Sequence, residues 1–125
     1  MSYITVADIK SNLISKVDVS EYILEADEEV EDLAEKLGVY DSTEIQTDPV
    51  HHKLKRYAVV FVLMRVAQDR LGTNQTDVSI EKYQALYDMY KAEYKELSQQ
   101  ITTEMVTGNV DAMVERVSST QIYRS

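Results

Sequence analysis

The side chains of this chain that could do chemistry are two histidines, a run of carboxylates and a set of tyrosines. His51 and His52 are adjacent, so on a helix they point about 100° apart and cannot share a metal ion as histidines four residues apart do. The chain has no cysteine, and no further ligand stands at a usable spacing. We therefore expect no metal site and no cofactor.

The carboxylates gather in one segment. Residues 18–37 contain nine acidic residues against one lysine, a net charge of −8, while the whole chain has a formal charge of −9. An acid/base pair needs burial or a fixed partner to tune it, and these carboxylates are expected to be solvated. The chain also lacks a glycine-rich phosphate loop, a G-x-S-x-G turn and a calcium loop. We predict that the protein is not an enzyme.

A helix is expected to carry these carboxylates. It is predicted to start near Asp18 or Ser20 and to run to Leu37, with Gly38 as the left-handed residue that ends it. The acidic residues are expected to lie off its apolar stripe, which steps by three or four positions. The stripe consists of Val19, Tyr22, Ile23, Ala26, Val30, Leu33, Ala34 and Leu37.

The stretch over residues 49–71 is predicted to be the central helix of the protein. Residues 57–64 carry no charge, which is typical of a helix buried on all sides, although a short valine-rich run also fits a buried strand. The boundaries favour the helix. Asp48 is expected to cap it, Pro49 fits its first position, and Gly72 fits its left-handed end.

The next predicted helix carries a heptad pattern of apolar and aromatic residues in which tyrosine dominates. Such a stripe packs either along the central helix of its own chain or against another subunit, where tyrosine is common. Both alternatives stay open at this point. We call these seven positions the tyrosine seam: Ile80, Tyr83, Tyr87, Tyr90, Tyr94, Leu97 and Ile101.

A short helix is predicted near the N-terminus. Thr5 is expected to cap it, with Asp8 reaching back, and Val6, Ile9 and Leu13 are expected to form its apolar side.

Two further segments have weaker patterns. Residues 38–47 are expected to form a loop that places Tyr40 and Ile45 against the helices. Beyond residue 102 the apolar residues fit either a continued helix or two short strands hinged at Gly108.

These elements predict an all-α fold, a small bundle of about four helices around the buried helix 49–71. We expect residues 1–101 to form one domain and residues 102–125 a C-terminal extension. The N-terminus lacks the layout of a signal peptide, and the apolar run is far shorter than the roughly 20 residues that span a bilayer. We therefore expect a soluble protein that does not use a membrane, with the cytoplasm favoured.

The distribution of charge along the chain indicates which kinds of contact the protein could make with partners. The charge of −9 argues against a protein that binds nucleic acid by neutralising phosphates. Residues 49–72 have a net charge of +4, so the acidic segment could meet Lys53, Lys55 and Arg56. Such a contact could form between neighbouring subunits or within one chain. The third alternative is that both groups of charged side chains face water.

Four segments together resemble the head-tail connector proteins of tailed bacteriophages, also called adaptor or head-completion proteins. They are YITVADIKSNL, DVSEYILEADEEVEDLAEKLGV, LKRYAVVFVLMRVAQDRL and DVSIEKYQALYDMYKAEYKEL. The resemblance covers roughly residues 3 to 100. The loop GVYDSTEIQT departs from the aromatic and proline-containing loop of many relatives, and residues 102–125 have no counterpart.

This resemblance implies a structural virion protein at the head-tail interface, made in the host cytoplasm. It implies a homo-oligomeric ring of about a dozen copies between the portal and the tail or stopper proteins, through which DNA passes without specific binding. The C-terminal arm would bind the portal through Ile122, Tyr123 and Arg124.

A ring needs two complementary faces on each subunit and an inner surface that tolerates DNA. We expect the contacts between subunits to use a basic and a tyrosine group: Lys53, Lys55, Arg56, Tyr83, Tyr87, Tyr90 and Tyr94. We expect the lumen to be lined by acidic residues that repel the DNA backbone. The acidic lumen candidates are Glu28, Glu31, Asp32 and Glu35.

Two other functions fit the same residues. One is an acidic DNA mimic, whose carboxylates imitate phosphates and block a nucleic-acid-binding protein. The other is a helical interaction module that uses the tyrosine seam to bind a partner helix. The mimic would be a monomer or dimer that competes with DNA, and it gives the tyrosines no special role.

Overall fold

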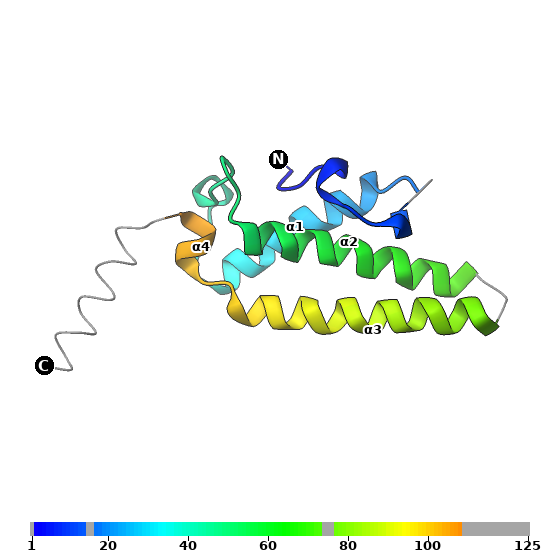
Figure 1. The fold of residues 1–125 in the computed structure, drawn as a ribbon. Coiled ribbons are helices and arrows are strands. Elements are labelled where there is room, and N and C mark those ends of the chain that lie inside the picture. The colour runs from blue at the N-terminus through cyan, green and yellow to red at the C-terminus, as the bar shows by residue number, and fades with distance from the viewer. Residues whose placement is uncertain (1, 15–16, 74–76, 109–125) are drawn as a thin grey trace, which may run out of the picture.

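A computed structural model describes residues 2–14, 17–73 and 77–108, and this part of the chain contains helices and no strand. The predicted all-α bundle is confirmed (Figure 1). Its α-helices are α1 (Ser20–Lys36), α2 (His52–Thr73), α3 (Asp77–Gln100) and α4 (Thr103–Thr107). Its short 3-10 helices are η1 (Val6–Asp8), η2 (Asn12–Ile14) and η3 (Ser42–Glu44). None of the helices in the described ranges is long and apolar enough to cross a membrane.

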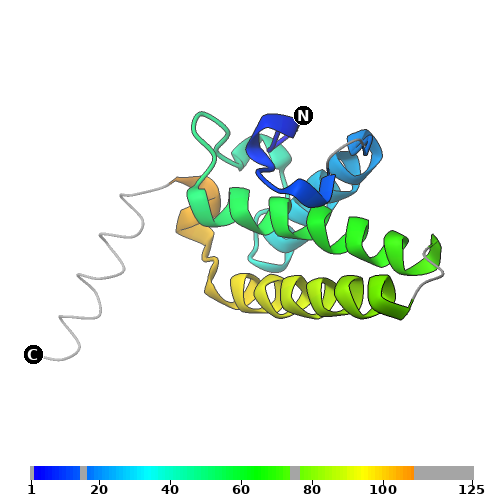
Figure 2. The same ribbon diagram turned by 45° about the vertical axis from the view of Figure 1, so that its right-hand side comes forward.

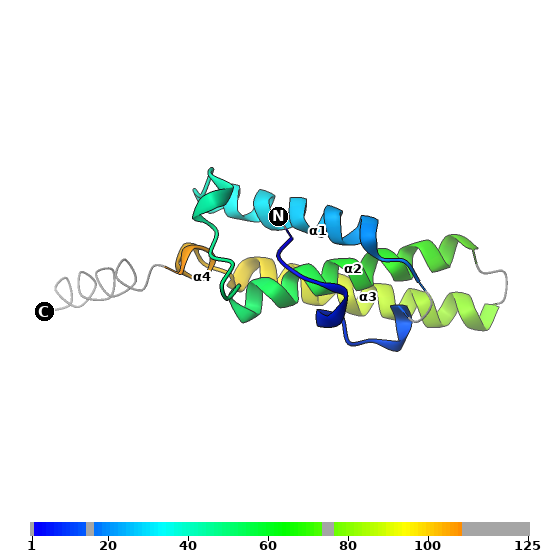
Figure 3. The same cartoon turned by 90° about the horizontal axis from the view of Figure 1, so that it is seen from above.

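Helix α2 is the centre of the bundle. Helix α3 runs antiparallel beside it (Figures 1 and 2). Seen from above, α1 lies on one side of α2, and the segment with η1 and η2 lies on the other (Figure 3). Every side chain from Tyr57 to Leu63 is buried, with at most 7% of its surface exposed. The uncharged run is therefore helical, as predicted, and it is buried on all faces except at its last residue, Met64, which is half-buried.

The predicted boundaries of the central helix are wrong. Helix α2 begins at His52, and Asp48 and Pro49 lie in a turn ahead of it. His51 stands just before the first turn, where its Nδ1 accepts a hydrogen bond from the Lys53 amide at 3.2 Å. At the other end the helix continues through Gly72 to Thr73, so Gly72 does not terminate it.

The predicted end of the acidic helix is confirmed. Gly38 has a φ of 93° and follows the C-cap Leu37. The Gly38 amide donates to the Glu35 carbonyl at 3.0 Å, and the Val39 amide donates to the Ala34 carbonyl at 2.8 Å. These two bonds are the Schellman pattern, which satisfies carbonyls at the end of a helix and favours glycine at this position.

Replacing Gly38 by Ala is expected to lower the free energy of unfolding by about 1 kcal/mol, because an L side chain disfavours the left-handed conformation. A β-carbon at residue 38 would meet no atom within 4 Å, so the loss would come from the backbone alone. Urea unfolding followed by circular dichroism measures it. Glu35→Ala, at an exposed position of the same turn, is the control, and an equal loss in the control would contradict the account.

Helix α1 packs its small residues against the core. Ala26, Val30 and Ala34 have no exposed surface. One acidic residue departs from the prediction that all of them lie off the apolar stripe, since Asp27 is buried. Its carboxylate accepts hydrogen bonds from the Tyr3 amide at 2.9 Å and the Ser2 hydroxyl at 3.0 Å. Asp27 therefore ties the N-terminal segment to α1.

Of four smaller predictions, two are confirmed and two are wrong. The Asp8 carboxylate accepts a hydrogen bond from the Thr5 amide at 2.8 Å, as predicted, and Ile45 is buried. Val6 is 56% exposed and Tyr40 is 81% exposed, so the predictions that these two side chains pack inside are wrong. Both lie in short 3-10 or loop segments, where a single helical periodicity does not decide which side is covered.

The described residues after α3 contain the short helix α4. The C-cap of this helix is Gly108, which has a φ of 68°. The Gln46 amide donates to the Val106 carbonyl at 2.9 Å, and the Thr103 hydroxyl donates to the Leu37 carbonyl at 3.0 Å. Helix α4 is therefore joined to the loop after α1. The predicted continuation through residues 110–117 lies outside the described residues.

Candidate functional surfaces

Helix α1 presents an acidic outer surface. Exposed side chains recur along it every three or four positions, the spacing that keeps them on one face. We call this face the acidic stripe, and it consists of Glu21, Leu24, Glu28, Glu31, Asp32 and Glu35. Its single large apolar residue, Leu24, is 62% exposed. All four acidic lumen candidates lie on the stripe.

The remaining carboxylates of α1 point toward the bundle and have partners there. Glu25 forms an ion pair with Arg65 at 3.3 Å, and Glu29 accepts a hydrogen bond from the Tyr94 hydroxyl at 2.7 Å. On the stripe, Glu31 accepts a 3.2 Å hydrogen bond from the Tyr3 hydroxyl. The polar side of α1 thus has an inner row that helps hold the fold and an exposed outer row, in which Glu31 is also bonded to Tyr3.

Two of the three predicted basic candidates, Lys55 and Arg56, contact acids that lie outside the acidic stripe. Arg56 of α2 donates two hydrogen bonds to the Glu93 carboxylate, at 2.6 and 2.9 Å, and these bonds raise the pKa of Arg56. Lys55 lies 3.5 Å from Asp8. Both contacts are within the chain, but neither acid belongs to the acidic segment 18–37, so these pairs are not the predicted meeting of that segment with the basic group. Partly exposed pairs of this kind contribute little stability.

Most residues of the tyrosine seam of α3 pack against other parts of the same chain. Tyr90, Leu97 and Ile101 are buried, whereas Tyr83 and Tyr87 are half-buried. Ile80, the first predicted seam residue, is 38% exposed and marks where the seam leaves the core. A role for the half-buried tyrosines in contacts between subunits stays a prediction.

Tyr94 joins three helices. Its ring stacks on Tyr57 of α2 with centroids 4.7 Å apart and lies 6.0 Å from Phe61. Its hydroxyl accepts from the Tyr57 hydroxyl at 2.9 Å and donates to Glu29 of α1. Burial, together with these hydrogen bonds, raises the pKa of Tyr94 well above its usual range. Tyr94 therefore helps to hold the three helices together, and its predicted role in contacts between subunits stays a prediction.

Stability is expected to fall as the pH rises above about 10, the pKa of tyrosine in an unfolded chain. Burial and the nearby Glu31 raise the pKa of Tyr3 to about 12, and the pKa of Tyr94 is raised as well. In this range the folded protein holds protons that the unfolded chain has lost, so alkali favours unfolding. Urea midpoints from about pH 8 to about pH 11 measure the loss. A Tyr3→Phe, Tyr94→Phe variant should show a shallower decline, and an identical slope would contradict the assignment.

The two histidines stack on each other, with ring centroids 4.4 Å apart. Burial lowers the pKa of His51, and the neighbouring His52 and Lys53 add to the effect. Among the residues that the structure describes, no three histidine, cysteine, aspartate or glutamate side chains stand close enough to hold a metal ion.

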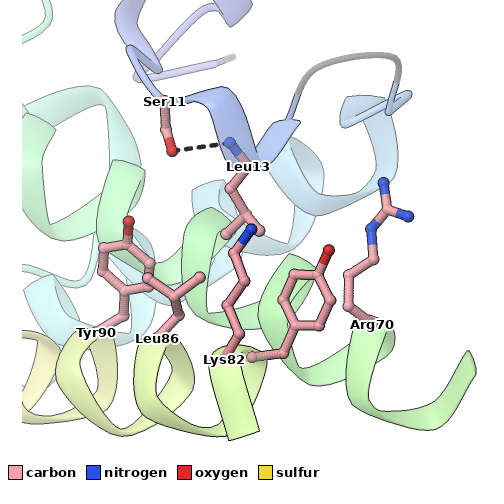
Figure 4. Close-up of a pocket in the computed structure, with 7 residues that line it drawn as sticks. Ser11, Leu13, Arg70, Lys82, Leu86 and Tyr90 are labelled. Atoms are coloured by element: carbon pink, nitrogen blue, oxygen red, sulfur yellow. Dashed lines mark hydrogen bonds between the residues drawn. The ribbon is translucent and has the colours of Figure 1, made fainter. Parts of the chain in front are cut away.

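A hollow of about 490 Å³ lies between the η2 segment and the α2 and α3 helices. Figure 4 shows Lys82, Leu86 and Tyr90 of α3 pointing toward the segment that carries Ser11 and Leu13, with Arg70 of α2 at the other side. We call this feature the basic hollow, and it is lined by Ser11, Leu13, Arg70, Lys82, Tyr83, Leu86 and Tyr90. Sequence reasoning missed it, because it joins three separate elements whose individual patterns give no sign of it.

Comparisons of the chain with protein-family models, curated proteins and solved structures find no match. The resemblance to connector proteins thus depends on the four segments quoted above. The portal-binding candidates Ile122, Tyr123 and Arg124 lie outside the described residues.

Proposed function

We propose that this protein is a structural subunit of a bacteriophage head-tail connector, assembled as a ring at the virion's head-tail interface, through which DNA passes. The observation that carries the proposal is the acidic stripe, an outer surface of carboxylates on a rigid helix whose inner carboxylates are already paired. The resemblance of four segments to connector proteins supports it, and so does the helical bundle.

The acidic stripe suits the wall of a DNA channel. Repeated around a ring, Glu28, Glu31, Asp32 and Glu35 would repel the phosphates, so that the duplex slides without sticking. The repulsion acts over about 8 Å at physiological salt, which is short enough to matter only where the DNA runs close to the wall. In this proposal the C-terminal arm binds the portal through Ile122, Tyr123 and Arg124.

Negative-stain microscopy of the portal protein from the same genome, with and without this chain, tests the proposal. We expect an added ring of density on the portal when the chain is present, and a complex of constant stoichiometry by light scattering. Portals that stay undecorated at high concentrations of the chain would contradict the proposal.

Neutralising the acidic lumen candidates is expected to make the channel retain DNA. In the variant Glu31→Gln, Asp32→Asn, Glu35→Gln, the portal complex should release duplex DNA more slowly at low salt than the wild-type complex, because repulsion from the wall is lost. A filter-binding assay of DNA release measures this. The control neutralises three exposed acids elsewhere, namely Glu81, Asp88 and Glu96. Equal retention in both variants would contradict a lumen position for the stripe.

The acidic stripe also fits an acidic DNA mimic, which is the second candidate function. A mimic would compete with DNA for a basic protein as a monomer or dimer and would leave the portal undecorated. The helical interaction module is supported less well, because Tyr90 is buried and Tyr94 contacts α1 and α2 in the same chain.

A further inference from the structure

The basic hollow and the acidic stripe have complementary chemistry. The hollow has two cationic side chains, Arg70 and Lys82, beside an apolar floor that includes Leu13 and Leu86. None of the residues that line it is acidic. The N-terminal half of the stripe has the opposite arrangement, an exposed leucine, Leu24, with an exposed carboxylate one turn away on each side.

The two features lie on different sides of the molecule. Helix α1 lies on one side of α2, whereas the η1 and η2 segment that borders the hollow lies on the other (Figure 3). A contact between two different surfaces of identical subunits is heterologous, and it leaves each copy with one surface free for the next copy. Repeating such a contact produces a ring when the rotation closes.

We propose that a second copy of this chain seats the N-terminal half of its α1 in the basic hollow. Leu24 lies on the apolar floor, while Glu21 and Glu28 face Arg70 and Lys82. This inference deepens the proposed function by assigning the contact between subunits, and it rests on that function for closure into a ring. This contact takes Glu28 away from the channel wall, and Glu31, Asp32 and Glu35, further along α1, remain there.

The proposal replaces the basic group expected from the sequence. Arg56 and Lys55 are engaged with Glu93 and Asp8 of their own chain, and neither of them lines the basic hollow, so they take no part in this contact. A guanidinium has five N–H donors, so Arg70 can bind a carboxylate while keeping other contacts. Charge pairs of this kind chiefly set the register and the rate of association, while the buried leucine adds affinity.

Charge reversal tests the contact. Lys82→Glu and Glu28→Lys change exposed positions, and each is expected to weaken association between copies by about tenfold or more, because like charges then face each other. An equal mixture of the two variants should associate again, since every contact between unlike copies is charge-matched. Sedimentation velocity, with and without the portal, measures this. The control Lys95→Glu reverses an exposed charge elsewhere on α3 and should have no effect.

Disulfide trapping locates the contact. The natural chain has no cysteine, so a Leu24→Cys protein and a Ser11→Cys protein each carry one thiol. Mixed and oxidised, they are expected to give a cross-linked dimer of the two variants in excess of either homodimer. Gln99→Cys, at an exposed position on α3, replaces Ser11→Cys in the control and should give no such excess.

The outcomes separate this inference from the proposed function. Rings on the portal that ignore both charge reversals and give no preferred cross-link would overturn the assigned contact and leave the connector function standing. No association under any condition, with or without the portal, would overturn both. Loss by each reversal, recovery on mixing and the selective cross-link together would establish the contact.

Discussion

Replacing Val60 by Asp is expected to unfold the protein. Val60 has no exposed surface and lies in the middle of α2, so the carboxylate would be buried among apolar side chains. An unpaired charge or a protonated acid in such a place costs about 4 kcal/mol or more. That is most of the stability of a small domain, about 5 to 15 kcal/mol. Circular dichroism at 25 °C should show loss of helix and of cooperative thermal unfolding.

The matched control is Gln68→Asp, an exposed position on the same helix. It introduces the same side chain where water can solvate it, so it should change the stability by less than about 0.5 kcal/mol. A cooperative, native-like melting curve for Val60→Asp would mean that α2 is not buried on this side.

The second large effect is expected for Tyr94→Ala, which should lower the free energy of unfolding by about 3 kcal/mol. The substitution removes the ring that stacks on Tyr57 and leaves the Glu29 carboxylate without its 2.7 Å hydrogen bond. It therefore loosens α1, α2 and α3 together. Urea unfolding followed by circular dichroism measures the change.

Two further variants divide that effect into its parts. Tyr94→Phe keeps the ring and removes only the hydroxyl, so we expect a loss of about 1 kcal/mol. Tyr87→Ala removes a half-buried tyrosine one heptad earlier and should cost clearly less than Tyr94→Ala. An equal decrease in the free energy of unfolding for Tyr94→Ala and Tyr87→Ala would contradict the account, because the contacts of Tyr94 with α1 and α2 would then add no stability.

The parts of the fold with strong local signals could be predicted from the sequence. The amphipathic spacing and Gly38 predicted α1 to within a residue or two at each end, and the uncharged run predicted a buried α2. In both helices the spacing of the apolar residues shows which faces are buried: one face for α1, and all faces for the uncharged run of α2. The N-terminal boundary of α2 was wrong, because Pro49 fits a turn as well as a first helical position.

Side chains that depend on distant segments could not be predicted. Asp27 resembles its acidic neighbours in sequence, but the Tyr3 amide and the Ser2 hydroxyl bury it. The tyrosine heptad did not indicate which of its members would pack inside, since that depends on where α1 crosses the pair of α2 and α3. The acidic stripe could be predicted, because it needs only one helix, whereas the basic hollow needs three elements.

The most direct test of the whole account is a cryo-electron microscopy map of the chain bound to its portal, at a resolution that shows helices. The account predicts a closed ring in which the N-terminal half of α1 lies in the basic hollow of the next copy. It also predicts that Glu31, Asp32 and Glu35 face the channel. Separate single copies on the portal, or a ring with the acidic stripe on its outer surface, would contradict the account.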